Sequence, residues 1–376
     1  MDFYGFYTGK IFDAYEYLGV HREGKGYTFR TFAPGAEKVA LIGEFNGWQD
    51  QAMNKAYDGN FWECHVEEAR EGEMYKYRIY LRDGQCIDHC DPYGFGMELR
   101  PKTASFIRDM DRFIFSDEAW MQSRSDCKNR PLNIYEVHMG SFRKPSGEPD
   151  AWYNYEEMSE ILIPYLKEKG YHYLEVMPLN EYPSDESWGY QSTGFFSPTS
   201  RYGTADQLKA FVNACHRNGI GVIMDFVPVH FAVDGYALAN YDGTALYEYP
   251  NSAVGVSEWG SCNFMHSRGE VRSFLQSAAY YWLKEFHMDG LRMDAISRAI
   301  YWQGSPERGV NRNAVEFLRY MNQGLKQLYP TVILSAEDST SFPGVTKPVS
   351  EGGLGFDYKW DMGWMNDTLN YFRTEP

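Results

Sequence analysis

Between about residue 133 and residue 338, the chain alternates between short apolar runs and longer segments with helical spacing. This alternation constrains the fold more than any other feature, because strands that alternate with long helices form βαβ units and hence a parallel sheet. The expected strands are 133–140, 171–178, 219–227, 289–295 and 331–338. The expected helices are 158–170, 205–219, 270–287 and 314–330, the first with Gly170 as its C-terminal cap.

Acidic side chains stand where three of these apolar runs end, at Asp225, Asp294 and Glu337. The periodicity alone fits either a (β/α)8 barrel or a doubly wound sheet. Polar residues at several successive strand ends favour the barrel, because its active site is built at the carboxyl ends of its strands. Since only five strands are counted before the chain stops at Pro376, we predict an α/β fold with an incomplete (β/α)8 TIM barrel.

Upstream of the barrel region, the hydrophobic pattern changes to a period of two. The runs 27–34, 39–45 and 74–82 alternate in the manner of β-strands and are separated by turn residues, which predicts a small β-sandwich. The first residues of the chain have near-helical spacing and predict a short amphipathic element packed on the rest. We therefore predict two domains, 1–125 for the N-terminal segment and sandwich and 126–376 for the barrel.

The strand that ends at Asp294 has the features expected of a strand that carries a nucleophile. Side chains alternate along a strand, so Arg292 and Asp294 share a face, and the guanidinium is expected to lower the pKa of the carboxyl and keep it ionised. Glu337 ends a separate strand and, in a partly dry site, can give a proton to a leaving oxygen. One attacking carboxylate and one acid/base are what retaining glycoside chemistry requires, with the two carboxyl groups roughly 5–5.5 Å apart.

Four segments carry a resemblance to known enzymes. GLRMDAIS (290–297), SAEDST (335–340) and DFVPVH (225–230) resemble the conserved regions of the α-amylase superfamily. WGYQSTGFFSPTSRYGT (188–204) narrows the resemblance to the glycogen and starch branching enzymes. The resemblance implies a catalytic pair and a set of substrate contacts. The pair is Asp294 as nucleophile and Glu337 as acid/base, and the substrate contacts are Trp188, Tyr190, Gln191, Asp225, His230 and Arg292, with Tyr190 stacking on the sugar.

The N-terminal region carries a resemblance of its own. TFAPGAEKVALIGEFNGWQ (31–49) resembles the carbohydrate-binding-like module that precedes the barrel in branching and debranching enzymes. Sugar rings present apolar faces that pack on flat aromatic side chains. Trp48 and Trp62 are therefore candidate platforms for a glucan chain on this module.

The resemblance implies a transglycosylase that cleaves an α-1,4-glucan, such as glycogen or amylose, and moves the released chain to a 6-hydroxyl through a glucosyl ester on Asp294. Two alternatives stay open at this point. A hydrolase of the same superfamily, debranching or trehalose-releasing, would use the same catalytic residues, and a non-catalytic glucan-binding fragment would use none of them. The superfamily has a further His–Asp pair that we expect beyond Pro376, so we expect a longer gene product and an inactive polypeptide here.

Composition limits the classes of partner and the compartment. The formal net charge of −16 argues against nucleic acid as a partner, because nucleic-acid binding requires a basic surface. Aromatic residues make up 17% of the chain, which fits a protein that handles sugars. The sequence shows no signal peptide, membrane span, zinc motif or EF-hand, and its six cysteines form no CxxC pair. We therefore predict a cytoplasmic enzyme with reduced thiols, no metal, no cofactor and no membrane partner, and the sequence carries no signal for its oligomeric state.

Overall fold

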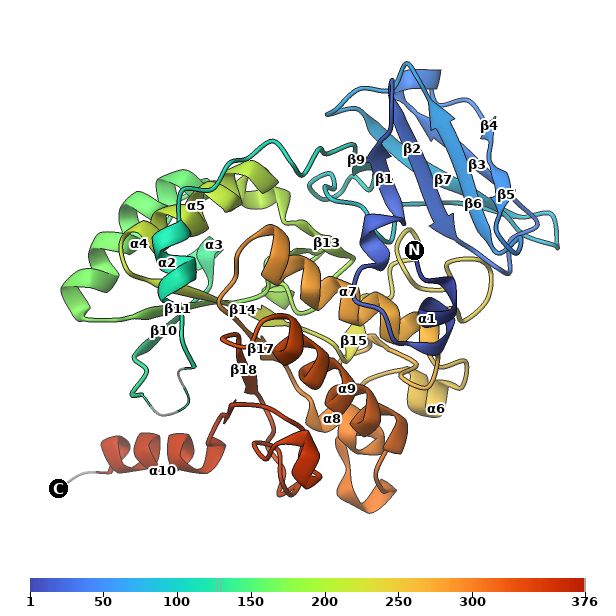
Figure 1. Cartoon of the computed structure of the whole chain (residues 1–376). Coiled ribbons are helices and arrows are strands. Elements are labelled where there is room, and N and C mark those ends of the chain that lie inside the picture. Colours follow the sequence, from blue (N-terminus) through green and yellow to red (C-terminus); the bar gives the residue numbers. More distant parts are fainter. Residues whose placement is uncertain (127, 129, 375–376) are drawn as a thin grey trace.

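A computed structural model describes residues 1–126, 128 and 130–374. Six parallel strands form the central sheet, and their spatial order is the same as their order in the chain (Figure 1). A doubly wound sheet reverses its strand order at a switch point, whereas strands of a barrel follow one another around it. The central sheet is therefore an incomplete (β/α)8 barrel, as the sequence predicts. Its strands are β10 (Ile134–Val137), β11 (Tyr173–Val176), β14 (Gly221–Phe226), β17 (Gly290–Met293), β18 (Ile333–Ala336) and β19 (Tyr358–Lys359).

Long helices connect the first five barrel strands in succession. The four helices expected from the sequence all form, as α4 (Tyr155–Lys169), α5 (Ala205–Arg217), α7 (Gly269–Glu285) and α9 (Arg312–Leu328). The chain in the described part also contains shorter helices and two short antiparallel pairs. These are α2 (Glu118–Ser123), α3 (Met139–Phe142), α6 (Ser252–Gly255), α8 (Ser297–Ile300), α10 (Met362–Arg373), β12 (Asn180–Glu181) with β13 (Gly194–Pro198), and β15 (His230–Phe231) with β16 (Cys262–Asn263). Among the described residues, no helix has the length and apolarity that a membrane span requires.

Local signals set the ends of helix α4. Asn154 caps its N-terminus by accepting a hydrogen bond from the Glu157 backbone, and the Glu157 side chain bonds back to the Asn154 N–H. Gly170 ends the helix in the left-handed conformation, with a φ of 75°, as the sequence predicts.

Strand β19 is a correction to the sequence analysis, which counts five strands. Its backbone pairs Ser335 with Tyr358 and Ala336 with Lys359, in parallel. Two residues of mixed polarity show no detectable period, so neighbouring β18 rather than the local sequence defines this strand. Helix α10 follows directly and extends away from the barrel toward the C-terminus (Figure 1).

Two antiparallel sheets form the predicted N-terminal sandwich (Figure 1). One has the order β1-β2-β6-β5 and the other the order β4-β3-β7-β8, with β9 paired to β7. The strands are β1 (Gly19–Arg22), β2 (Tyr27–Phe32), β3 (Lys38–Gly43), β4 (Gln51–Ala52), β5 (Asn54–Ala56), β6 (Phe61–Val66), β7 (Met74–Tyr80), β8 (Cys86–His89) and β9 (Ser105–Phe106). The prediction that Trp62 serves as a glucan platform is wrong, because Trp62 is only 4% exposed and its indole N–H donates to the Ala33 carbonyl. Trp48 is partly exposed.

The sandwich and the barrel share one hydrophobic core. Tyr93, which follows β8, stacks on Phe196 of β13 with ring centroids 4.9 Å apart and meets Phe274 of α7 edge-on at 5.2 Å. Phe95 stacks on Tyr281 of α7 at 5.7 Å. Helix α7 is therefore buried on one side by the barrel and on another by residues that come from the module.

The N-terminal segment fastens to the same helix. Helix α1 (Phe3–Thr8) lies against α7, and the Ser273 hydroxyl donates to the Phe6 carbonyl at 2.9 Å. The Gln276 side-chain amide donates to the carbonyls of Gly9 and Ile11. Gly269 at the start of α7 allows this close approach, since a Cβ there would lie 1.9 Å from the Tyr7 carbonyl oxygen.

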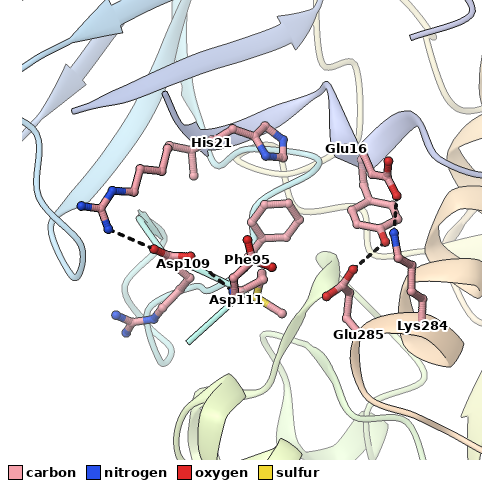
Figure 2. A pocket seen from close by; sticks show the side chains of 12 residues that line it. Glu16, His21, Phe95, Asp109, Asp111, Lys284 and Glu285 are labelled. Carbon is pink, nitrogen blue, oxygen red and sulfur yellow. Dashed lines mark hydrogen bonds and ion pairs between the residues drawn. The ribbon is translucent and has the colours of Figure 1, made fainter. Parts of the chain in front are cut away.

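A cavity of about 260 Å³ lies along this seam between the N-terminal region and the barrel (Figure 2). Ion pairs and hydrogen bonds close its sides: Lys284 of α7 pairs with Glu16 at 2.5 Å, and the Tyr15 hydroxyl donates to Glu285 at 2.8 Å. Because these two contacts join the N-terminal segment to α7, the cavity belongs to the contact between the two regions.

A buried polar network closes the opposite face of the barrel, where strands β14 and β17 begin. His216 of α5 lies between two carboxylates, with Nδ1 2.6 Å from Asp117 and Nε2 2.8 Å from Asp289. Trp120 of α2 stacks on His216 and donates to Asp289 at 2.8 Å. Burial alone would lower the pKa of His216, but its hydrogen bonds to the two carboxylates outweigh burial and raise it. The network holds α2 against the barrel.

Candidate active site

The three predicted acids meet at one edge of the barrel sheet. Asp225 is the penultimate residue of β14, Asp294 directly follows β17, and Glu337 directly follows β18. The strand register places Asp225 beside Arg292 and Arg292 beside Ser335. Because neighbouring parallel strands end together, the alternation of side chains brings all three acids to the same end of the barrel.

Arg292 joins these acids with a single guanidinium group. Its Nη1 lies 2.7 Å and 2.8 Å from the two oxygens of Asp225 and 2.8 Å from Asp294, and its Nη2 lies 3.4 Å from Glu337. The side chain of Arg292 is 7% exposed. One buried cation therefore holds three carboxyl groups in a fixed arrangement.

This arrangement corrects the expected charge state of Asp294. Burial raises the pKa of Asp294 well above its usual range, the negative charge of Asp225 and then that of Glu337 add to the effect, and Arg292 opposes it. Burial also raises the pKa of Asp225 to about 6. Arg292 acts in the predicted direction, but one cation shared among three buried carboxyls cannot keep all of them ionised. The group therefore retains a proton at a pH where isolated carboxyls would have lost theirs.

The backbone at Ala295 fixes the Glu337 side chain. Ala295 has a φ of 47°, in the left-handed region that non-glycine residues rarely adopt, and its N–H donates to the Glu337 carboxylate at 2.8 Å. The Ile296 N–H donates to the Glu337 carbonyl at 3.1 Å. The turn after β17 thus holds the candidate acid/base beside the candidate nucleophile.

Tyr190 and His230 stand on either side of this group. The Tyr190 hydroxyl donates to Asp225 at 2.6 Å. Burial lowers the pKa of His230 to about 4, so its ring is neutral near pH 7, and its Nδ1 has no hydrogen-bond partner among the described residues. Because Nδ1 is buried, a contact between this neutral ring and a sugar hydroxyl would use Nε2.

A pocket of about 410 Å³ opens over the acids. The structure brings six of the eight predicted site residues to its wall, and the other two, Asp225 and Arg292, lie beneath it. The lining residues are Glu186, Ser187, Trp188, Tyr190, Gln191, His230, Trp259, Asp294, Ala295 and Glu337. Trp188 is 57% exposed and Trp259 is 48% exposed, so two indole rings border the pocket.

Trp259 is a site residue that the sequence analysis missed. Its ring lies 5.2 Å from that of His230, and the Arg298 guanidinium lies 5.3 Å from the ring centroid. It belongs to an irregular loop between β15 and β16, where no periodicity could assign it. The dipeptide Trp259-Gly260 is the only local signal.

Glu175 of β11 is a second missed residue. It is 2% exposed, and its Oε1 has no hydrogen-bond partner among the described residues. Burial raises the pKa of Glu175 to about 8, with a further contribution from the charge of Asp225. The apolar run that contains Glu175 gives no sign that its side chain faces the barrel interior near the acids.

The last missed residues belong to β19 and its end. The Arg292 guanidinium lies 5.4 Å from the ring centroid of Trp360, and Lys359 pairs with Asp338, the residue after Glu337, at 3.0 Å. Asp361 follows β19 after one intervening residue and caps helix α10.

Two family models match the chain. Carbohydrate-binding module 48 (isoamylase N-terminal domain) matches residues 17–94, and the catalytic domain of alpha amylase matches residues 157–242. Among solved structures, a putative alpha amylase from Salmonella typhimurium superposes with a TM-score of 0.68 at 26% identity, covering 86% of this chain and 50% of that one. A pullulanase from Paenibacillus barengoltzii superposes with a TM-score of 0.67 at 20% identity, covering 86% of this chain and 53% of that one, and shares the fold.

Similar proteins of known name extend over the whole chain. It is 47% identical to the 1,4-alpha-glucan branching enzyme GlgB of Fusobacterium nucleatum, over 100% of this chain and 61% of that protein. It is 43% identical to GlgB of Bacillus subtilis, over 100% of this chain and 61% of that protein. The chain thus spans about three fifths of the length of the curated relatives it matches. Over its whole length the chain is therefore similar to the GlgB 1,4-alpha-glucan branching enzymes, and its two parts match a carbohydrate-binding module and the catalytic domain of alpha amylase.

Proposed function

We propose that the gene product containing this chain is a 1,4-α-glucan branching enzyme, which cleaves an α-1,4-glucan and transfers the released chain to a 6-hydroxyl of glycogen or amylose. The observation that carries the proposal is identity of 47% over the whole chain to a protein of that name, together with three acids on one guanidinium at the barrel mouth. We further propose a cytoplasmic location and a domain division at 125/126. The two family-model matches, which fall on either side of that division, support it.

In the first step we assign attack on the anomeric carbon to Asp294 and protonation of the leaving oxygen to Glu337. The step requires one proton on the three carboxyls, located on Glu337, and an anionic Asp294. The raised pKa values of Asp225 and Asp294 support a proton held on these aspartates near neutral pH, so attack by Asp294 requires this proton to pass to Glu337. Arg292 then stabilises the carboxylate that is to attack.

In the second step the glucosyl ester on Asp294 is broken by an acceptor. Glu337, now a carboxylate, takes the proton of a sugar 6-hydroxyl, the new α-1,6 bond forms, and Asp294 is released. Water in place of the sugar would give hydrolysis, so transfer depends on an acceptor chain that is bound while water is kept out. The exposed rings of Trp188 and Trp259 are suited to hold sugar rings at the pocket, and we assign Tyr190, Gln191 and His230 to contacts with the donor chain.

The test is a branching assay on the full-length gene product. We expect the iodine absorbance of amylose to fall while new α-1,6 linkages appear that isoamylase can cleave. Few new reducing ends should form. Asp294→Ala and Glu337→Gln are each expected to reduce branching by at least 10³-fold with unchanged melting temperature. Branching that survives either substitution contradicts the catalytic assignment, and reducing ends without new linkages would favour a hydrolase.

A further inference from the structure

The two residues at the end of the sixth barrel strand contact the partners of both catalytic carboxyls. Trp360 lies over the Arg292 guanidinium, which holds Asp294, and Lys359 pairs with Asp338, which directly follows Glu337. Neither residue lines the pocket that contains Asp294 and Glu337. Both residues line a separate pocket beside Asp338, so their link to Asp294 and Glu337 runs through the groups that they hold.

The contact with Trp360 restrains the one freedom that the carboxylates leave to Arg292. The three acids bind its Nη atoms, and its Nε has no hydrogen-bond partner among the described residues. A guanidinium held only by its Nη atoms can still tilt about its long axis. The Trp360 ring, whose centroid lies 5.4 Å from the guanidinium carbon, opposes this tilt through cation–π attraction. The Trp360 backbone is itself fixed, because its N–H donates to the Ala336 carbonyl at 2.9 Å.

The contact with Lys359 fixes the chain on the other side of Glu337. Asp338 is fully buried, and besides Lys359 it accepts hydrogen bonds from the backbone and the hydroxyl of Thr340 at 2.9 Å and 2.7 Å. The Lys359 ammonium also donates to the Thr340 carbonyl at 2.8 Å. Asp338 thus closes a loop whose only cation, among the described residues, is Lys359.

We propose that β19 is a positioning strand for catalysis, in which Trp360 sets the plane of the Arg292 guanidinium and Lys359 anchors the loop that carries Glu337. The proposal rests on the proposed function, and it assigns both residues to orientation rather than to contact with substrate. A misplacement of a reacting group by about 1 Å can cost roughly 100-fold in rate, so loss of either contact should lower kcat and leave KM nearly unchanged.

Trp360 is tested by comparing Trp360→Leu with Trp360→Phe, which keeps an aromatic face. The charged and titratable groups that face Asp294 are Arg292 beside it, Asp225 and Tyr190 from the β14 side, and Glu337 from β18. A loosened Arg292 stabilises the Asp294 anion less, so the acid limb of kcat/KM should move to higher pH in Trp360→Leu. In that variant we expect kcat to fall on the order of ten-fold and KM to stay within about two-fold of the parent value. Trp360→Phe should keep most of the parent kcat and an acid limb close to that of the parent.

Lys359 is tested by Lys359→Met against a matched control, Lys326→Met. Lys326 forms an ion pair of similar exposure with Asp357 at 2.7 Å, beside the same two strands but away from Glu337. A purely structural role predicts equal effects of the two substitutions. The positioning role predicts a roughly ten-fold loss of kcat in Lys359→Met and none in Lys326→Met.

The outcomes separate this proposal from the proposed function. If the parent enzyme makes no branches, the proposed function fails. The role of Trp360 can then still be tested by ¹³C titration of the Asp294 carboxyl in the 376-residue chain, where the titration midpoint should be higher in Trp360→Leu than in Trp360→Phe. If the parent is active and Trp360→Leu leaves the acid limb unmoved or lowers it, the role of Trp360 is overturned. Equal losses in Lys359→Met and Lys326→Met overturn the role of Lys359.

Discussion

At the scale of single residues, Glu175 shows how the barrel interior controls charge. Its carboxyl is buried near Asp225 without a cation of its own. Its ordinary pKa is 4.5, and burial raises it to about 8 in the folded protein. Between these pH values the folded state keeps a proton that the unfolded state has lost, so the contribution of Glu175 to stability falls as pH rises from about 4.5 to about 8.

Glu175→Gln removes this titration while keeping the shape of the side chain. Relative to the parent, we expect the variant to gain ~3 kcal/mol of unfolding free energy between pH 5 and pH 8, since each pH unit of difference in pKa corresponds to about 1.4 kcal/mol. Urea denaturation at the two pH values measures it. Glu160→Gln on the exposed face of α4 is the control and should show no such gain. A Glu175→Gln variant whose stability follows that of the parent at both pH values contradicts the buried, protonated carboxyl.

Residue-level prediction from the sequence works where position on a strand decides the outcome. Asp225, Asp294 and Glu337 can be found because polar residues that end apolar strands collect at one edge. The charge state of Asp294 cannot be found in this way, because it depends on the sum of burial and three neighbours. Trp259 cannot be found either, since a long irregular loop carries it to His230.

At the scale of elements, the long helices and strands follow from their own periodicity, and the short ones depend on their neighbours. Helix α9 has a full apolar stripe and forms where expected, whereas β19 exists because β18 offers it a free edge. Helix α2 is a similar case, because a single turn and a half of helix has little stability by itself. The Asp117–His216–Asp289 network stabilises α2 by holding it against the barrel.

His216→Asn tests whether this network fastens α2. The substitution removes the imidazole that joins Asp117 to Asp289, while His287 still contacts Asp117 and Arg124 still pairs with Asp289. We expect a loss of ~2 kcal/mol in unfolding free energy and faster amide exchange across α2. In the parent, the raised pKa of His216 means that its contribution is complete below pH ~6.5 and is lost as pH rises through the folded-state value. Hydrogen exchange across a pH series measures both effects.

His172→Asn is the matched control, because His172 is exposed on the loop before β11. It should leave the exchange of α2 and its pH dependence unchanged. Unaltered exchange of α2 in His216→Asn would mean that apolar packing around Trp120 alone holds the helix.

At the scale of the whole molecule, the module, the N-terminal segment and the barrel meet on one helix, α7. Each contact is of a different kind, with stacked rings from Tyr93 and Phe95, backbone approach at Gly269 and ion pairs along the cavity of Figure 2. The sequence predicts the two folding units and their order, since each has its own period. It cannot predict their docking, because contacts between distant segments leave no periodic trace in either.

Gly269→Ala is a specific probe of this docking. The added methyl would lie 1.9 Å from the Tyr7 carbonyl oxygen, so the backbone of the N-terminal segment must move away. We expect a loss of ~2 kcal/mol in stability and faster exchange in α1, measured by thermal denaturation and amide hydrogen exchange. Gly147→Ala is the control, because a Cβ there meets nothing within 4 Å. Equal behaviour of the two variants would show that α1 adapts without cost.

The shared core also limits how this architecture can be rearranged. A binding module joined by a tether can be shuffled between enzymes as a self-contained cassette, because nothing but the tether connects it to its host. Here Tyr93 and Phe95 bury their rings among Phe196, Phe274 and Tyr281. Removal of the module would therefore expose apolar surface on both the module and the barrel. The two parts are therefore expected to be inherited together, and a graft onto a foreign barrel would have to bring a matching α7 with it.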